Sequence, residues 1–177
     1  MKKVLVISSS PRKNGNSERL CQAFAEGARQ AGHDVEVICL RDYNLNYCIA
    51  CYACNDLGRC VQEDGMNELA EKMKSADVIA FGTPVYFYTM SGQLKVFIDR
   101  LLPCYTEIKA DIYMFCTAWD PETPNLELTL ESIRGCTRDC FEQCKEKGAL
   151  AVGGVYEVGD IEGRDELRQA CEMGKNA

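Results

Sequence analysis

The sequence predicts an α/β fold in which helices cover both faces of a doubly wound, five-stranded parallel sheet. Short apolar runs rich in β-branched residues alternate with longer segments whose apolar residues recur at helical spacing. The short runs are apolar on both faces, which is typical of buried parallel strands. The 177 residues, 46% of them hydrophobic, are enough for one well-packed core, so we expect residues 1–177 to form a single domain.

The first strand is predicted over residues 3–8, Lys-Val-Leu-Val-Ile-Ser. A polar stretch follows, and a helix is expected to begin at Asn16 or Ser17 because its apolar residues then form one stripe. Gly32 is a typical helix stop. The second strand is predicted over residues 34–40, where apolar and polar residues alternate.

The middle of the chain contains the segment with the weakest pattern. Residues 41–63 show no clear period and are predicted to be a loop. A helix over 65–75, a strand over 77–82 and a helix over 91–102 follow, each with apolar residues at the appropriate spacing. Pro84 and a run of aromatic residues separate the strand from the second of these helices.

The last third repeats the alternation. A fourth strand is predicted over 112–117 and a loop over 118–127. A long helix over 128–147, a fifth strand over 149–155 and a closing helix over 165–174 complete the chain.

Strand–helix alternation of this kind leaves few topologies, because the crossovers are right-handed. The two leading strand orders are 2-1-3-4-5 and the dinucleotide-binding order 3-2-1-4-5-6. Ligands in such sheets bind at the carboxyl ends of the strands, near the point where the strand order reverses. The loops in which to expect a site are therefore 8–17, 83–91 and 117–127.

Composition excludes several classes of partner and location. The net charge of −7 argues against nucleic acid or an anionic membrane as the main partner, since phosphate binding needs a basic face. No apolar run approaches the ~18 residues of a membrane span. The N-terminal apolar run is short and lacks a cleavage site, so we expect no signal peptide and a cytoplasmic protein. Because the cytoplasm is reducing, we expect the twelve cysteines of the chain to be thiols rather than disulfides.

Loop 8–17 has the composition of an anion site. It joins a buried strand to a helix N-terminus, where free N–H groups and the helix dipole favour a phosphate. Gly15 permits close approach of the backbone. The dinucleotide and ATP glycine patterns are missing, so a mononucleotide is the natural ligand. An ordinary capped strand–helix turn is the alternative. The predicted phosphate-binding residues are Ser9, Ser10, Arg12, Asn16 and Ser17.

Several motifs resemble a known family. Residues 9–12 followed by 15–17 look like the phosphate loop of the NADPH-dependent FMN reductases, and 15–18 also resembles that of flavodoxins. Residues 82–87, 91–95 and 99–100 match the second loop and third helix of the same reductases, and the similarity continues into 159–163. The resemblance covers nearly the whole chain.

This resemblance implies a flavodoxin-like fold of strand order 2-1-3-4-5 that binds FMN. NAD(P)H would reduce the flavin, and a quinone, free flavin or similar small acceptor would oxidise it. Because the flavin performs the chemistry, no catalytic side chain is expected, and His33 is predicted to be a solvated turn residue. Members of the family are commonly dimers, so a homodimer or larger homo-oligomer is expected. A non-enzymatic, flavodoxin-like electron carrier is the alternative.

By similarity, two loops would hold the isoalloxazine ring. We expect the first to contribute Pro84, Val85, Tyr86 and Phe87. We expect the second, after the fourth strand, to contribute Thr117, Ala118 and Trp119. Ordinary packing of the aromatic residues beneath a loop is the alternative for both. Asp99 and Arg100 are expected in helix packing or a dimer contact rather than in the chemistry.

Four cysteines form a compact motif, Cys48-x2-Cys51-x2-Cys54-x5-Cys60. Four thiolates at close spacing can ligate a 4Fe–4S cluster. The motif departs from the ferredoxin run and instead resembles that of the iron–sulfur flavoproteins, which would exchange electrons with a ferredoxin. The same four residues could instead bind zinc or remain free thiols near the flavin, although zinc would prefer two well-separated cysteine pairs.

The remaining cysteines need no cofactor. Cys136, Cys140 and Cys144 recur every four residues in the predicted long helix, so we expect them to fill the core as small hydrophobic side chains. Cys104, after the third helix, fits no predicted element.

Overall fold

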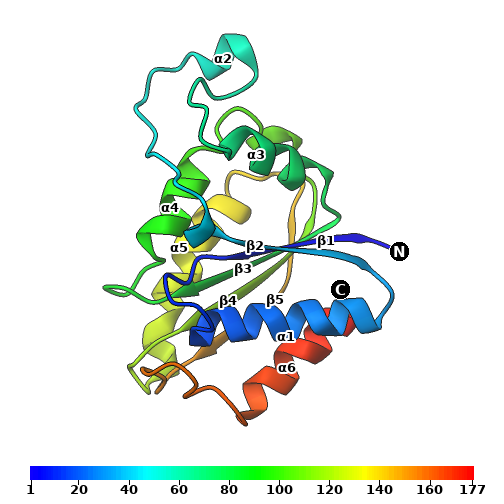
Figure 1. The fold of residues 1–177 in the computed structure, drawn as a ribbon, viewed down its shortest axis with the longest axis vertical. Helices are drawn as coiled ribbons and strands as arrows, with labels where there is room; N and C mark the ends of the chain where they lie inside the picture. Colours follow the sequence, from blue (N-terminus) through cyan, green and yellow to red (C-terminus); the bar gives the residue numbers. More distant parts are fainter.

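The computed structural model describes residues 1–177, and its sheet has the predicted order. All neighbouring strands are parallel, in the order β2-β1-β3-β4-β5 (Figure 1). The strands are β1 (Lys3–Ser8), β2 (Asp34–Cys39), β3 (Val78–Pro84), β4 (Asp111–Thr117) and β5 (Lys145–Val152). The flavodoxin-like topology is therefore confirmed, and the dinucleotide-binding order is not found.

Helices cover both faces of this sheet. One face carries α1 (Asn16–Gln30) and α6 (Asp165–Lys175), which pack against each other as the lower layer of Figure 1. The other face carries α3 (Met66–Ser75), α4 (Gly92–Asp99) and α5 (Glu127–Thr137). The one-turn helix α2 (Cys54–Leu57) lies away from the sheet, and the 3-10 turns are Leu40–Asp42, Tyr105–Glu107 and Thr123–Leu126.

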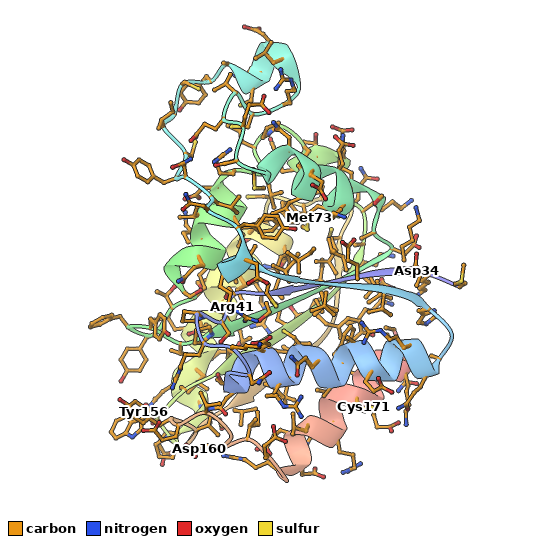
Figure 2. All side chains as sticks on the ribbon, in the orientation of Figure 1. Asp34, Arg41, Met73, Tyr156, Asp160 and Cys171 are labelled. Carbon is orange, nitrogen blue, oxygen red and sulfur yellow. The ribbon has the colours of Figure 1, made fainter.

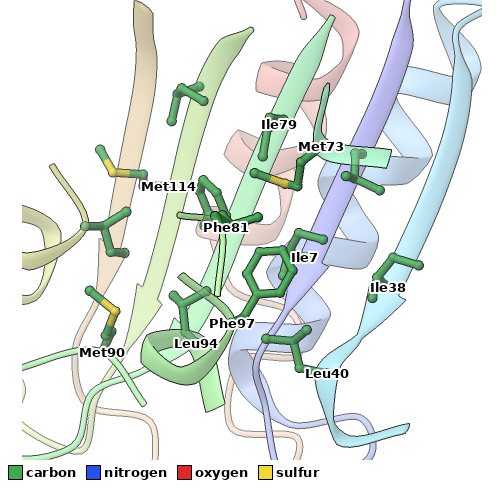
Figure 3. Packing of buried hydrophobic residues seen from close by; sticks show 14 of the residues in the cluster. Ile7, Ile38, Leu40, Met73, Ile79, Phe81, Met90, Leu94, Phe97 and Met114 are labelled. Atoms are coloured by element: carbon green, nitrogen blue, oxygen red, sulfur yellow. The ribbon is translucent and has the colours of Figure 1, made fainter. Parts of the chain in front are cut away.

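Each face of the sheet has its own hydrophobic core. Beneath α3, α4 and α5, Phe81 of β3 and Phe97 of α4 are fully buried together with Ile7 of β1 (Figure 3). On the opposite face Phe24 of α1 packs against Tyr113 of β4, with 4.8 Å between ring centroids. The two cores fix the strand ends, and the strand ends position the loops of the site.

The predicted long helix over 128–147 is too long, and this prediction is corrected. The helix α5 ends at Thr137, and β5 already begins at Lys145. The Lys-Glu-Lys run has helical propensity, but parallel pairing with β4 prevails over it, starting with Lys145 opposite Asp111. Arg134 of α5 donates to the Glu146 carboxylate at 2.7 and 2.8 Å, which ties the helix to the start of the strand.

Because α5 is shorter than predicted, the positions predicted for its cysteines also change. Cys140 follows α5 and is exposed, whereas Cys136 and Cys144 are half-buried, so the three do not form one buried stripe. Cys104, which fitted no element predicted from the sequence, is buried in the core beside α4. All twelve cysteines are free thiols. None of the helices has the length and apolar character to cross a membrane.

Candidate functional site

A cleft lies where the loops after β1, β3 and β4 meet at the carboxyl ends of the strands. Its volume is about 180 Å³. Ten of the twelve residues predicted to bind a cofactor line it, together with Pro11, Gly15, Val155 and Tyr156. Figure 2 shows Tyr156 at this end of the molecule. The predicted residues in its wall are Ser10, Arg12, Asn16, Ser17, Pro84, Val85, Tyr86, Thr117, Ala118 and Trp119.

The other two predicted residues lie outside the cleft. Ser9 is fully buried, and its hydroxyl donates to the Gly82 carbonyl at 3.0 Å and accepts from the Ser91 hydroxyl at 2.9 Å. It joins β1 to β3 and to the start of α4. Phe87 is wholly exposed and points into solvent.

The predicted phosphate loop, residues 8–17, leads into the N-terminus of α1, where the first N–H groups have no backbone partner. The backbone N–H groups of Asn16, Ser17 and Glu18, in the first turn of α1, donate to no backbone carbonyl. Gly15 precedes them, and a Cβ at that position would lie only 2.4 Å from the Ser10 hydroxyl. This cradle of donors beside a glycine fits a phosphate group, which binds through such N–H groups and the helix dipole.

A buried ion pair holds the phosphate loop from behind. The Glu18 carboxylate, almost fully buried, accepts from Arg41 at 2.8 and 2.9 Å and from the Asn14 N–H at 2.8 Å. Figure 2 shows Arg41 just beyond β2, above the first turn of α1. This pair was not predicted from the sequence. An acidic residue in the first helical turn was the available signal, but nothing in the sequence pointed to Arg41 as its partner.

Two predicted phosphate-loop residues also anchor the segment after β5. Arg12 donates to the Tyr156 carbonyl at 2.9 Å, and the Asn16 amide donates to the Glu157 carbonyl at 2.9 Å. Asp160 in turn accepts from the Tyr156 and Glu157 N–H groups, both at 2.8 Å. The lower edge of the cleft, where Figure 2 labels Tyr156 and Asp160, is therefore fastened to the phosphate loop.

The wall after β3 is a tight hairpin. Tyr86 and Thr89 exchange backbone hydrogen bonds at 3.0 and 3.1 Å, and between them Phe87 and Tyr88 have φ values of 50° and 61°. Two successive positive φ values are those of a type I′ turn, which normally selects Asn and Gly. The turn carries Phe87 away from the cleft while Pro84, Val85 and Tyr86 line it.

The wall after β4 is more open. Trp119 lines the cleft but is 73% exposed, so its indole is free to cover a planar ligand. Asp120 beside it accepts from the Asn125 amide at 2.8 Å and from the Glu122 N–H at 2.9 Å. These bonds keep the pKa of Asp120 below its usual range, so the carboxylate stays ionised and is not a proton donor near neutral pH.

The four motif cysteines gather around a second hollow. Cys48, Cys51, Cys54 and Cys60 all line a space of about 120 Å³ beside the end of α4. No three His, Cys, Asp or Glu side chains lie close enough together in the structure to share one metal ion. A 4Fe–4S cluster makes a different demand, because each of its irons takes its own thiolate.

The backbone of this segment has an unusual shape. Ala50 and Tyr52, which alternate with the cysteines, have φ values of 51° and 55°. The Ala50 N–H donates to the Cys48 sulfur at 3.5 Å. Backbones in which left-handed residues alternate turn their N–H groups inward around anionic groups, including iron–sulfur clusters. The segment therefore fits a cluster.

A second buried ion pair joins the two ends of the cysteine segment, residues 46–64, which contains the four motif cysteines. Arg100 donates to both Asp64 oxygens at 2.9 and 3.0 Å and to the Asn46 carbonyl at 2.7 Å. Both side chains of the pair are almost fully buried. Burial alone would raise the pKa of Asp64, but hydrogen bonds from Arg100 and the Asn46 N–H lower it to about 2. From the sequence, Arg100 was expected in helix packing or a dimer contact, and its pairing with Asp64 was not predicted.

The two candidate sites lie at opposite ends of α4. Ser91 caps the start of that helix next to the phosphate loop, whereas Arg100 follows its last residue and faces the cysteine hollow. The eight residues of α4 alone span roughly 12 Å.

Comparison with known proteins gives one family match. The family model described as NADPH-dependent FMN reductase matches residues 2–115. An iron–sulfur flavoprotein of Archaeoglobus fulgidus is 37% identical over 101 residues, covering 57% of this chain and 46% of the relative. One of Methanocaldococcus jannaschii is 43% identical over 101 residues, covering 57% and 52%. The chain thus spans about half the length of the curated relatives it matches.

Two further similarities concern quinone reductases. An FMN-dependent NADH:quinone oxidoreductase of Opitutus terrae is 32% identical over 114 residues, covering 58% of this chain and 53% of the relative. The solved structure of an NAD(P)H:quinone oxidoreductase from Methanothermobacter marburgensis superposes with a TM-score of 0.75. That pair is 23% identical and covers 99% of this chain and 98% of the other, so it demonstrates a shared fold.

Proposed function

Because this chain belongs to the NADPH-dependent FMN reductase family, we propose that it is an oxidoreductase that binds FMN in the cleft. Electrons from NAD(P)H would pass through the flavin to a small acceptor such as a quinone or free flavin. The observation that supports this most is the open first turn of α1 beside Gly15, located where the strand order reverses between β1 and β3.

Each wall of the cleft has a task in this proposal. The N–H groups of residues 16–18 and the Ser17 hydroxyl bind the phosphate, and Arg12 adds positive charge. Val85 and Tyr86 would supply an apolar wall for the ring, and Trp119 would cover it from the β4 side. When bound, FMN accepts a hydride and gives up its electrons to the acceptor.

Anaerobic reduction tests the proposal directly. The protein is loaded with FMN, and NADH or NADPH is added without oxygen while the visible flavin absorption is recorded. We expect the absorption to bleach and to recover when a quinone is added. Double-reciprocal plots should be parallel, because one flavin face serves both substrates in turn. FMN that neither nucleotide reduces would contradict the enzyme and favour an electron carrier.

A 4Fe–4S cluster on Cys48, Cys51, Cys54 and Cys60 is the second candidate function. It is favoured by the common hollow of the four thiols and by the left-handed residues between them. The protein would then be an iron–sulfur flavoprotein that exchanges single electrons with a ferredoxin. Iron and acid-labile sulfide, measured after anaerobic reconstitution, test this. Cys51→Ser should lose them, and Cys140→Ser, at an exposed thiol outside the hollow, should retain them.

Assembly and location complete the proposal. We infer a homodimer or larger homo-oligomer, as the family resemblance implies, and a reducing, cytoplasmic location consistent with twelve free thiols. Sedimentation at several protein concentrations tests the first point. A monomer at micromolar concentration, with FMN bound, would contradict it.

A further inference from the structure

Cys60 is held more firmly than the other thiols of its motif. The side chain of Asn67, in α3, accepts from the Cys60 N–H at 2.9 Å and donates to the Cys60 carbonyl at 3.0 Å. This two-point contact fixes the backbone of Cys60 to a helix that covers the sheet. The remaining three cysteines lie in the exposed part of the segment or in the one-turn helix α2.

Arg100 lines the same hollow as Cys60. Its two terminal nitrogens donate to Asp64 and to the Asn46 carbonyl, and its third nitrogen, Nε, is buried without a partner. The side chain is 1% exposed and lines the hollow with Cys60. A buried donor without an acceptor is costly, and a bound anionic group beside it would satisfy it.

Electrostatics at Arg100 are consistent with this geometry. Arginine stays protonated in proteins, so its guanidinium is a permanent positive charge. Its hydrogen-bond partners are the Asp64 carboxylate and the Asn46 carbonyl, and Cys60 lines the hollow beside it.

We propose that Arg100 is a positioning residue for the cluster, fixing the closed end of the cysteine segment and directing its Nε–H at the sulfur of Cys60. This inference rests on the proposed cluster and extends it to a residue outside the cysteine motif. A cluster with four thiolate ligands is anionic, and each added electron makes it more so. A buried cation and an N–H donor at one sulfur stabilise the reduced form and raise the reduction potential.

The test is a redox titration of the anaerobically reconstituted protein, with the reduced cluster followed by electron paramagnetic resonance. Arg100→Gln removes the charge, and its midpoint potential should shift to more negative values. Asp64→Asn removes the carboxylate that partly neutralises Arg100, so its shift should be to more positive values. Arg100→Lys keeps the charge and should fall between Arg100→Gln and the unchanged protein.

Arg59 provides the matched control. It precedes Cys60 in the sequence, but its side chain is 57% exposed and pairs only with Glu63 at the surface. Water screens such a charge, so Arg59→Gln should leave the potential unchanged. Release of iron to a chelator should be faster in Arg100→Gln than in Arg59→Gln.

The outcomes separate this inference from the proposal on which it rests. If the protein without substitutions takes up no iron and sulfide, both the cluster and the role of Arg100 are overturned. A loaded cluster whose potential is the same in Arg100→Gln, Asp64→Asn and Arg59→Gln overturns the role of Arg100 and leaves the cluster in place. Should Arg100→Gln fail to fold, the sign of the shift in Asp64→Asn decides.

Discussion

The phosphate loop and the cysteine segment both follow neighbouring strands at the same edge of the sheet, yet they are built differently. The phosphate loop passes directly from β1 into α1, and its shape is that of a strand–helix connection. The cysteine segment leaves β2, runs beyond the sheet and returns before α3 (Figure 1). Each is held by an arginine that makes a two-point contact with a buried carboxylate.

The difference lies in how much each loop depends on that ion pair. The Glu18–Arg41 pair supports a loop that is already fixed by β1 and α1, and Arg41 remains 20% exposed. The Asp64–Arg100 pair joins both ends of a segment with little regular structure of its own, and Arg100 is 1% exposed. We therefore expect the phosphate loop to tolerate the loss of its ion pair better than the cysteine segment.

The largest expected effect is the loss of stability when the carboxylate of an ion pair is removed. Asp64→Ala leaves a buried guanidinium without its partner and should lower the free energy of unfolding by about 3–5 kcal/mol. Glu18→Ala leaves Arg41 in reach of water and should cost about 1–3 kcal/mol. Denaturant unfolding measures both. Equal losses would contradict the different roles of the two pairs.

The phosphate loop should show its importance in binding rather than in folding. Ser17→Ala removes a hydroxyl from the cleft and should weaken FMN binding by about 1.5–3 kcal/mol, more than tenfold. Fluorescence titration of the apoprotein with FMN measures this. The control is Ser75→Ala, at the exposed end of α3, which should bind FMN normally. An unchanged affinity in Ser17→Ala would remove the loop from the site.

Acid should weaken the cysteine segment through Asp64. Its pKa is about 2 in the folded protein against an ordinary value of 3.8, so its ionised form stabilises the fold. That stabilisation, roughly 2 kcal/mol, is complete above about pH 4 and is lost as the pH falls towards 2. Denaturant unfolding at several pH values should show a smaller dependence in Asp64→Asn. A variant with the same dependence would assign the acid sensitivity to other carboxylates.

The smallest predicted effect separates a buried cysteine from an exposed one. Cys116→Ala empties space in the core between β4 and the helices and should cost about 1 kcal/mol. Cys140→Ala, at an exposed thiol, should change stability by less than about 0.5 kcal/mol. Thermal unfolding of both variants measures the difference. The opposite order would contradict the burial of Cys116 and the exposure of Cys140.

Much of the fold was predictable because the strands are buried on both faces. Residues 3–8 and 77–82 could not be mistaken for exposed elements, and the topological rule then located the three loops of the cleft. The prediction failed at β5, the strand at one side of the sheet. Lys145 to Lys147 lie in an edge strand whose exposed side chains give no apolar signal, so local helical propensity was misleading.

In the candidate sites, too, only part of the arrangement was predictable from the sequence. Residues of the cleft follow strand ends, so their positions could be read from the chain order. The positions of Arg41 and Arg100 could not be predicted in this way, because these residues contact carboxylates 23 and 36 residues away in the chain. The exposure of Phe87 was also hidden, since two positive φ values at aromatic residues contradict the usual preferences of the turn.

The charged start of β5 has a consequence for association. An open parallel sheet ends in two edge strands whose unpaired backbone groups invite other chains to add to it. Here β5 begins with the exposed Lys145, Glu146 and Lys147, and β2 at the opposite edge exposes Asp34 and Glu36. Burying these charges would be costly, so both edges resist strand addition and aggregation. A second subunit is therefore more readily accommodated on the helical faces than at the ends of the sheet.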